Sequence, residues 1–259
     1  AQFGEKIINF PAVYDMLSRM KAKLDAGRSI LYQTARYVDI YKALEDIARD
    51  RTLTPEERKE MKLYSRLADA FTPLAKGMNS EYANQNAYDA ISVHGGSGFI
   101  MEYKCQRLFR DARIFSIYEG TTQLQVVAAI RYVTNGTYLG IIKEMLEKEV
   151  APEFQALKDR VAKMVEKYED AINYVKAAGN NDLHDFLARR LYEMTAEIIM
   201  SLLILDDATR APELFAKSAN VYVRYAEGTV AGHYAYIKEF KAEDLADFLA
   251  ATPEEAPAE

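Results

Sequence analysis

The sequence predicts an all-α fold, and two observations support this class. Only 7 prolines and 12 glycines interrupt a chain of 259 residues. Long segments carry apolar residues at intervals of three and four, which gathers them on one face of a helix. The hydrophobic content is 49%, which is sufficient for one large packed domain or two ordinary ones.

The first long helix is expected to begin at Pro11, because proline suits the first turn of a helix. An apolar stripe with helical spacing follows this residue and indicates one continuous element. The stripe consists of Val13, Met16, Leu17, Met20, Leu24, Leu31, Ala35 and Val38.

The second long helix is expected to begin at "TPEE", residues 54–57. Thr54 is suited to the N-cap and Pro55 to the first position, while Glu57 completes a capping box. We expect this helix to end near His94, where "HGGSGF" follows. Several glycines together cost too much backbone entropy for a helix interior.

Three further segments complete the first half of the chain. A short helix is expected at about 103–110, and "IFSIYEG" after it is β-branched and aromatic, so it does not favour a helix. The next helix is expected at about 121–134. Asn135-Gly136 within "TNGTY" is a strong turn signal and is the most plausible domain boundary.

The second half reads as three helical segments, at about 137–178, 182–209 and 212–240, separated by "AGNN" and "RAPE". The predicted organisation is therefore a helical domain at 1–134, a second helical domain at 137–250 and a flexible tail at 251–259.

Composition argues against several classes of function. Lys and Arg total 33 against 39 for Asp and Glu, a net charge of -6, so no nucleic-acid partner is expected. The single cysteine, Cys105, and three scattered histidines favour neither a disulfide framework nor a metal site. The longest apolar run, 198–205, is too short for a membrane span, and no signal peptide is visible. A cytoplasmic location is expected.

Two neighbouring motifs are open to more than one interpretation. The glycines at 95, 96 and 98 either bring the backbone close to a ligand or form a plain turn between helices. "RLFRDAR", which contains Arg107, Arg110, Asp111 and Arg113, is more typical of a solvated helix surface than of a site.

Glu119 is the leading candidate for chemistry. It lies in "SIYEGTTQLQ" between Tyr118 and Gly120, which offer little charge compensation. Burial without a partner would make this carboxylate a stronger base, as general-base catalysis requires. The alternative is an acid near the start of the helix at Thr121, where the helix dipole favours negative charge.

Two long stretches together resemble the C-terminal helical region of flavin-dependent acyl-CoA dehydrogenases. They are "FGEKIINFPAVYDMLSRMKAKLDAGRSILY" and "AISVHGGSGFIMEYKCQRLFRDARIFSIYEGTTQLQ". The resemblance covers residues 1–134, and the later helices resemble an additional C-terminal domain that some bacterial members carry. It implies a four-helix bundle that holds FAD together with a β domain absent from this chain.

The resemblance also implies roles for individual residues. Glu119 matches the glutamate that removes the α-proton of an acyl-CoA thioester, while the β-hydrogen leaves as hydride to the flavin. It also implies a homo-oligomer and an electron transfer flavoprotein as the redox partner. The implied FAD contacts are Thr121, Gln123, Gly96 and Phe3, and the implied lining of the acyl pocket is Tyr118 and Gly120.

The sequence departs from the family pattern in two places. Ser92 stands where a glutamine is usual, and an arginine that commonly precedes the "FG" of Phe3 would fall upstream of Ala1. We therefore expect a C-terminal fragment that carries the base but is inactive alone. In the intact parent, Glu119 is expected to lie in a water-poor cleft beside the flavin, near the glycine turn.

Two alternatives remain open. The first is a helical assembly or partner-docking module that has lost its flavin site, which Ser92 favours. The second is an acyl-CoA oxidase-like flavoenzyme of the same fold, which differs mainly in oxygen access to the flavin.

Overall fold

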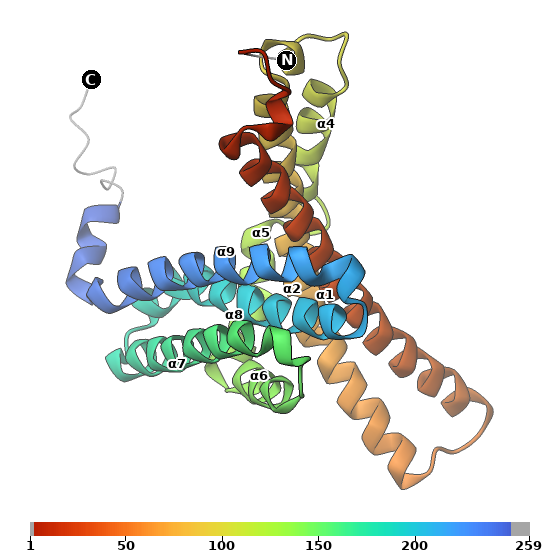
Figure 1. Cartoon of the computed structure of the whole chain (residues 1–259). Helices are drawn as coiled ribbons and strands as arrows, with labels where there is room; N and C mark the ends of the chain where they lie inside the picture. The colour runs from red at the N-terminus through yellow and green to blue at the C-terminus, as the bar shows by residue number, and fades with distance from the viewer. Residues whose placement is uncertain (1–2, 250–259) are drawn as a thin grey trace.

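The computed structural model describes residues 3–249, and this part of the chain is helical and contains no strand (Figure 1). The all-α prediction is confirmed, whereas the whole of the proposed tail at 251–259 lies outside the described residues. The α-helices are α1 (Pro11–Asp50), α2 (Pro55–His94), α3 (Gly96–Phe99), α4 (Cys105–Ala112), α5 (Thr122–Thr134), α6 (Thr137–Glu147), α7 (Gln155–Ala178), α8 (Asn181–Arg210) and α9 (Pro212–Glu239). The 3-10 helices are η1 (Ile7–Asn9), η2 (Arg113–Ser116), η3 (Pro152–Phe154) and η4 (Ala242–Phe248).

The long helices α1 and α2 form an antiparallel hairpin that extends through the whole molecule (Figure 1). Helices α7, α8 and α9 pack together and cross this hairpin near its middle, where α8 and α9 contact α1. Helix α5 packs between α2 and α8. Among the described residues, no helix is long and apolar enough to cross a membrane.

Both ends of α2 follow the sequence prediction. The Thr54 hydroxyl accepts from the Glu57 amide at 3.1 Å, and the Glu57 carboxylate accepts from the Thr54 amide at 2.8 Å, so the capping box is present. Helix α2 ends at His94 because Gly95 has a φ of +59°. The chain is helical again from Gly96, so the interruption is confined to one residue.

Two boundaries in the prediction need correction. The segment at 137–178 is not one helix, because α6 ends at Glu147 and α7 begins only at Gln155. Pro152 explains the break, since proline disfavours a helical conformation at the residue before it and lacks an N–H donor. The short helix expected at 103–110 is α4, which begins two residues later and ends at Ala112.

The apolar stripe on α1 predicts the helix correctly but not which side chains are buried. Leu24 and Leu31 are 45% and 50% exposed. The buried face of α1 instead contains small residues such as Ala22 and Ala26, because α2 approaches from one side and α8 and α9 from the other. The closeness of α2 is visible at Gly27, whose carbonyl accepts from Asn79 Nδ2 at 3.1 Å.

One continuous core joins the two halves of the chain. Pro73 interrupts the backbone hydrogen bonds inside α2, and two tyrosines from the second half bind carbonyls there. The Tyr138 hydroxyl donates to the Ala70 carbonyl at 2.5 Å, and the Tyr192 hydroxyl donates to the Pro73 carbonyl at 2.9 Å. Side chains of the second half therefore bind the backbone of α2 directly.

A buried acid lies where α2, α8 and α9 meet. Glu197 is 1% exposed and accepts hydrogen bonds from the hydroxyls of Tyr82, at 2.7 Å, and Tyr222, at 2.8 Å. Burial raises the pKa of Glu197 from 4.5 to about 7, although the two tyrosine donors oppose the shift.

Replacing Gly77 with alanine is expected to destabilise the protein. A Cβ at this position would overlap the Tyr192 hydroxyl oxygen, and Tyr192 is 1% exposed and has little room to move. Overpacking of this kind costs about 1–3 kcal/mol, measurable by urea unfolding. The cost should be smaller in a Tyr192→Phe background, which lacks the overlapping atom. An equal cost in both backgrounds would contradict this packing.

Glu197 also predicts a pH dependence of stability. Between pH 4.5 and about 7, folded Glu197 keeps a proton that the unfolded chain has released, so its contribution to stability falls as the pH rises through this window. The full effect is on the order of 3 kcal/mol. The stability of Glu197→Gln relative to the unmodified protein should therefore be greater at pH 8 than at pH 5. The same relative value at both pH values would argue against a buried, titrating Glu197.

Candidate active site

Glu119 lies in a strained turn between η2 and α5. Its φ is +54° and that of Gly120 is +85°, so both residues adopt the left-handed conformation. Glycine adopts this conformation freely, whereas a residue with a side chain rarely does. Such strain persists only where surrounding contacts hold it, and it often marks functional sites.

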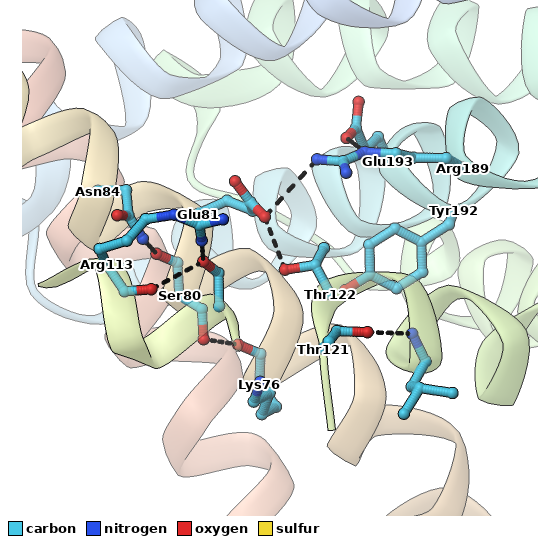
Figure 2. A network of polar contacts seen from close by, with 12 residues as sticks. Lys76, Ser80, Glu81, Asn84, Arg113, Thr121, Thr122, Arg189, Tyr192 and Glu193 are labelled. Atoms are coloured by element: carbon cyan, nitrogen blue, oxygen red, sulfur yellow. Dashed lines mark hydrogen bonds and ion pairs between the residues drawn. The ribbon is translucent and has the colours of Figure 1, made fainter. Parts of the chain in front are cut away.

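Side chains from α2 and α5 hold this turn. Lys76 Nζ, from the middle of α2, donates to the Gly120 carbonyl at 2.5 Å. Gln125 Nε2 donates to the same carbonyl at 3.3 Å and to the Glu119 carbonyl at 3.4 Å. The first turn of α5 is closed by Thr121, whose hydroxyl accepts from the Leu124 amide at 3.2 Å (Figure 2). The backbone of Glu119 is thus fixed although its side chain is exposed.

An open pocket of about 560 Å³ lies beside this turn. Its lining is mostly apolar and comes from α1, α2 and the segment before α5, with Glu119 and Lys76 as its charged residues. The exposed Leu31 of α1 is part of this lining. The other lining residues are Thr34, Thr72, Ala75, Asn79, Ser80, Ala83, Phe115 and Tyr118.

The structure places two of the expected site residues in the lining of this pocket, and Gly120 is adjacent to them in sequence but is not part of the lining. Glu119 and Tyr118 line it, and Gly120 carries the carbonyl that Lys76 binds. Thr121 and Gln123 follow immediately and are exposed at the start of α5. Glu119 is itself exposed, so the described chain alone does not form the water-poor cleft expected for the intact parent.

Gly96 and Phe3 are not brought to this pocket. The glycine turn follows the end of α2, whereas Lys76 contacts the Gly120 carbonyl from its middle. At about 1.5 Å per residue, the helix between Lys76 and Gly95 spans roughly 28 Å. A Cβ at Gly96 would have no neighbour within 4 Å, and Phe3 is 90% exposed. Both positions are therefore open to a group from outside the described chain.

The other motifs have ordinary structural roles. Gly98 permits close packing, since a Cβ there would lie 2.7 Å from the Ile91 carbonyl oxygen. The arginines of "RLFRDAR" are exposed, as expected for a helix surface. The Ser92 hydroxyl bonds the Tyr88 carbonyl of its own helix at 3.4 Å. Among residues 3–249, no group of three or more His, Cys, Asp or Glu side chains is arranged to hold a metal ion.

Sequence reasoning missed Lys76 and the contacts that α2 makes with α5. Thr122, the first residue of α5, is buried and donates from its hydroxyl to Glu81 Oε1 at 2.6 Å (Figure 2). Asn84 Nδ2 donates to the Ala112 carbonyl at 3.1 Å. Polar residues in the middle of a long helix give no local signal, because their partners lie 28 to 44 residues away in sequence.

The fold and the pocket define a helical bundle that presents a carboxylate at the edge of an apolar cavity. Residues 1–133 match the family model described as "Acyl-CoA dehydrogenase, C-terminal domain". Residues 134–245 match a second model, "Acyl-CoA dehydrogenase C terminal". The chain belongs to the acyl-CoA dehydrogenase family.

Individual relatives agree with this assignment. The chain is 28% identical over 218 residues to butyryl-CoA dehydrogenase of Syntrophomonas wolfei, covering 80% of this chain and 33% of the relative. It is 34% identical over 124 residues to the caffeyl-CoA reductase-Etf complex subunit CarC of Acetobacterium woodii, covering 48% of this chain and 26% of the relative. The chain thus spans about a quarter to a third of these curated relatives.

A solved structure shows the same fold. A Bacillus anthracis acyl-CoA dehydrogenase, crystallised with FAD, superimposes with a TM-score of 0.68 at 21% identity. The superposition covers 98% of this chain and 48% of the other. Both halves of the present chain are therefore included in the common fold.

Proposed function

We propose that this chain is the C-terminal part of a flavin-dependent acyl-CoA dehydrogenase and that Glu119 is its catalytic base. The observation that carries the proposal is the position of Glu119, a carboxylate in a held left-handed turn at the edge of an apolar pocket of about 560 Å³. An apolar pocket suits an acyl chain, and a fixed carboxylate beside it suits removal of a proton from carbon.

The proton step depends on orientation. The hydrogen bonds of Lys76 and Gln125 hold the carbonyls of Glu119 and Gly120, so the Glu119 side chain starts from a defined position. Orientation of this kind makes proton abstraction an intramolecular step. Covering the exposed turn with the rest of the protein would exclude water and strengthen the carboxylate as a base.

The residues present are suited to FAD. Thr121 uses its hydroxyl oxygen as an acceptor for the Leu124 amide, which leaves its proton free for a flavin. Gln123 is exposed, and Gly96 leaves open space beside the backbone for the adenosine half, with Phe3 as the expected pyrophosphate contact. When bound, FAD would accept the β-hydrogen of the substrate as hydride.

The proposed partners follow from the same assignment. They are an acyl-CoA substrate, a second copy of the chain and an electron transfer flavoprotein. The relative from Acetobacterium woodii carries Etf in its name, which supports the last of these. Dehydrogenase chemistry is favoured over an oxidase because the relatives include a butyryl-CoA dehydrogenase.

Besides Ser92, one structural observation favours the alternative of a docking module without chemistry. Several large apolar side chains of the segment from α3 to α5 are exposed. Such exposure indicates a surface that is covered in the complete protein. These side chains are Phe99, Met101, Leu108, Ile114, Leu124 and Val127. Docking alone gives no reason for a strained glutamate beside an apolar pocket, so we favour the enzyme.

The central test replaces Glu119 with glutamine in the intact protein, because glutamine keeps the shape but cannot accept the proton. Turnover of a short acyl-CoA should fall by about 10²–10⁴-fold, while flavin content and absorbance stay unchanged. A matched control is Glu243→Gln, an exposed acid in η4, which should retain full turnover. Normal turnover in Glu119→Gln would rule out this residue as the base.

The 259-residue chain alone should not dehydrogenate acyl-CoA substrates, because the turn that carries Glu119 is exposed and the covering domain is not part of this chain. The measurement uses the purified chain with added FAD, several acyl-CoA lengths and an artificial electron acceptor. Substrate-dependent reduction of the acceptor above a no-protein control would contradict the expectation.

A further inference from the structure

A row of polar contacts joins the second half of the chain to the turn that carries Glu119 (Figure 2). It begins at α9, where His233 Nε2 lies 2.8 Å from Glu193 Oε2 of α8. The other oxygen of Glu193 accepts from Arg189 Nε at 2.8 Å. Arg189 Nη2 in turn lies 3.7 Å from Glu81 Oε1 of α2.

The row ends at the first residue of α5. The Glu81 oxygen that faces Arg189 also accepts the hydroxyl proton of Thr122, at 2.6 Å. Thr122 is 5% exposed and follows Gly120 by two residues. Its hydroxyl is thus a buried anchor immediately after the strained turn.

Two residues of α2, Lys76 and Glu81, hold the turn, and they differ in how their side chains are supported. Lys76 reaches the Gly120 carbonyl directly. Glu81 has a side chain that is 26% exposed, and Arg189 is its only cationic partner among the described residues. Without that cation, water would compete for the carboxylate and Glu81 could rotate away from Thr122.

Arg189 is itself held in place. Burial alone would raise the pKa of Glu193, but the nearby His233 ring and the hydrogen bond from Arg189 outweigh this and leave the pKa lowered. Glu193 therefore remains an anion that fixes the Arg189 guanidinium. Tyr192, three residues after Arg189 on α8, packs against Gly77 of α2. This contact fixes the position of this part of α8 on α2.

We propose that Arg189, in the second half of the chain, is a positioning residue for Glu119. It holds the Glu81 carboxylate against Thr122 and thereby fixes the start of α5 and the turn before it. The inference rests on the proposed function of Glu119 and assigns a role in that site to the additional helical region. Arg189 acts through Glu81 and does not touch the pocket lining given above.

The first test measures hydrogen exchange in the 259-residue chain and does not depend on activity. The probes are the amides of Leu124 and Gln125, which bond Thr121 at 3.2 and 3.1 Å. In Arg189→Gln their exchange should be roughly three- to tenfold faster, because a partly exposed ion pair in a network contributes modestly to local stability. Amides in the middle of α7 serve as the internal reference and should not change.

The matched control is Arg210→Gln on the same helix. Arg210 pairs with Asp206 at 2.8 Å, and its side chain is 69% exposed. This variant removes the same charge from α8 but should leave the exchange of Leu124 and Gln125 unchanged. Faster exchange of all amides in Arg189→Gln, the α7 reference included, would indicate general destabilisation and overturn the inference.

The second test uses turnover by the intact protein. Arg189→Gln should lower kcat roughly three- to tenfold with unchanged flavin content, whereas Arg189→Lys should recover part of the loss because it restores the charge. Thr122→Val should also lower kcat, and Thr122→Ser should restore it. Since both residues act through Glu81, Arg189→Gln should have little further effect in the Thr122→Val background.

The outcomes separate this inference from the proposed function. Full turnover by Glu119→Gln would rule out the proposed role of Glu119. The exchange measurement would still decide whether Arg189 holds the turn. If Glu119→Gln is inactive but Arg189→Gln matches Arg210→Gln in kcat or in exchange, the positioning role is overturned. Additive effects of Arg189→Gln and Thr122→Val on the activation free energy would overturn it as well.

Discussion

The hydrogen bond from the Lys76 ammonium to the Gly120 carbonyl is the interaction on which the site depends. A non-glycine residue in the left-handed conformation costs on the order of 1–3 kcal/mol, and Glu119 carries that cost. A hydrogen bond to a charged group contributes about 1.5–3 kcal/mol, which is sufficient to offset it. Because Lys76 projects from the middle of a 40-residue helix, this hydrogen bond ties the turn to α2.

The second half of the chain stabilises the same part of α2 from its other side. The hydroxyls of Tyr138 and Tyr192 donate to the α2 carbonyls of Ala70 and Pro73. Arg189 approaches Glu81 a few residues further along. The position of Lys76 and Glu81 relative to the turn therefore depends on packing between the two halves, which one continuous core provides.

Local signals in the sequence predict much of the fold. Thr54, Pro55 and Glu57 specify the start of α2, and Gly95 specifies its end, because caps and positive φ angles depend on adjacent residues. The break between α6 and α7 was predictable from Pro152 but was not predicted. The exposure of Leu24 and Leu31 was not predictable from periodicity, which locates an apolar face without saying what covers it.

The residues of the site also fall into those that local sequence indicates and those that only long-range contacts reveal. Glu119 stands out in sequence because its neighbours Tyr118 and Gly120 offer little charge compensation, and the resemblance supplies its proposed role. Lys76, Glu81 and Arg189 could not be found, since the contacts that join them to the turn are long-range and each looks like a surface charge in its own helix. Thr121 and Gln123 are exposed, and their proposed flavin contacts remain predictions.

The most direct measurement is a crystal structure of the intact protein with FAD and a non-reactive acyl-CoA thioether. The account predicts that the acyl chain enters the pocket beside Leu31 and Phe115 and that the Glu119 carboxylate lies about 3–3.5 Å from the carbon equivalent to the α-carbon. It also predicts that Lys76 still binds the Gly120 carbonyl. An acyl chain bound elsewhere, with the Glu119 carboxylate directed into solvent, would contradict the account.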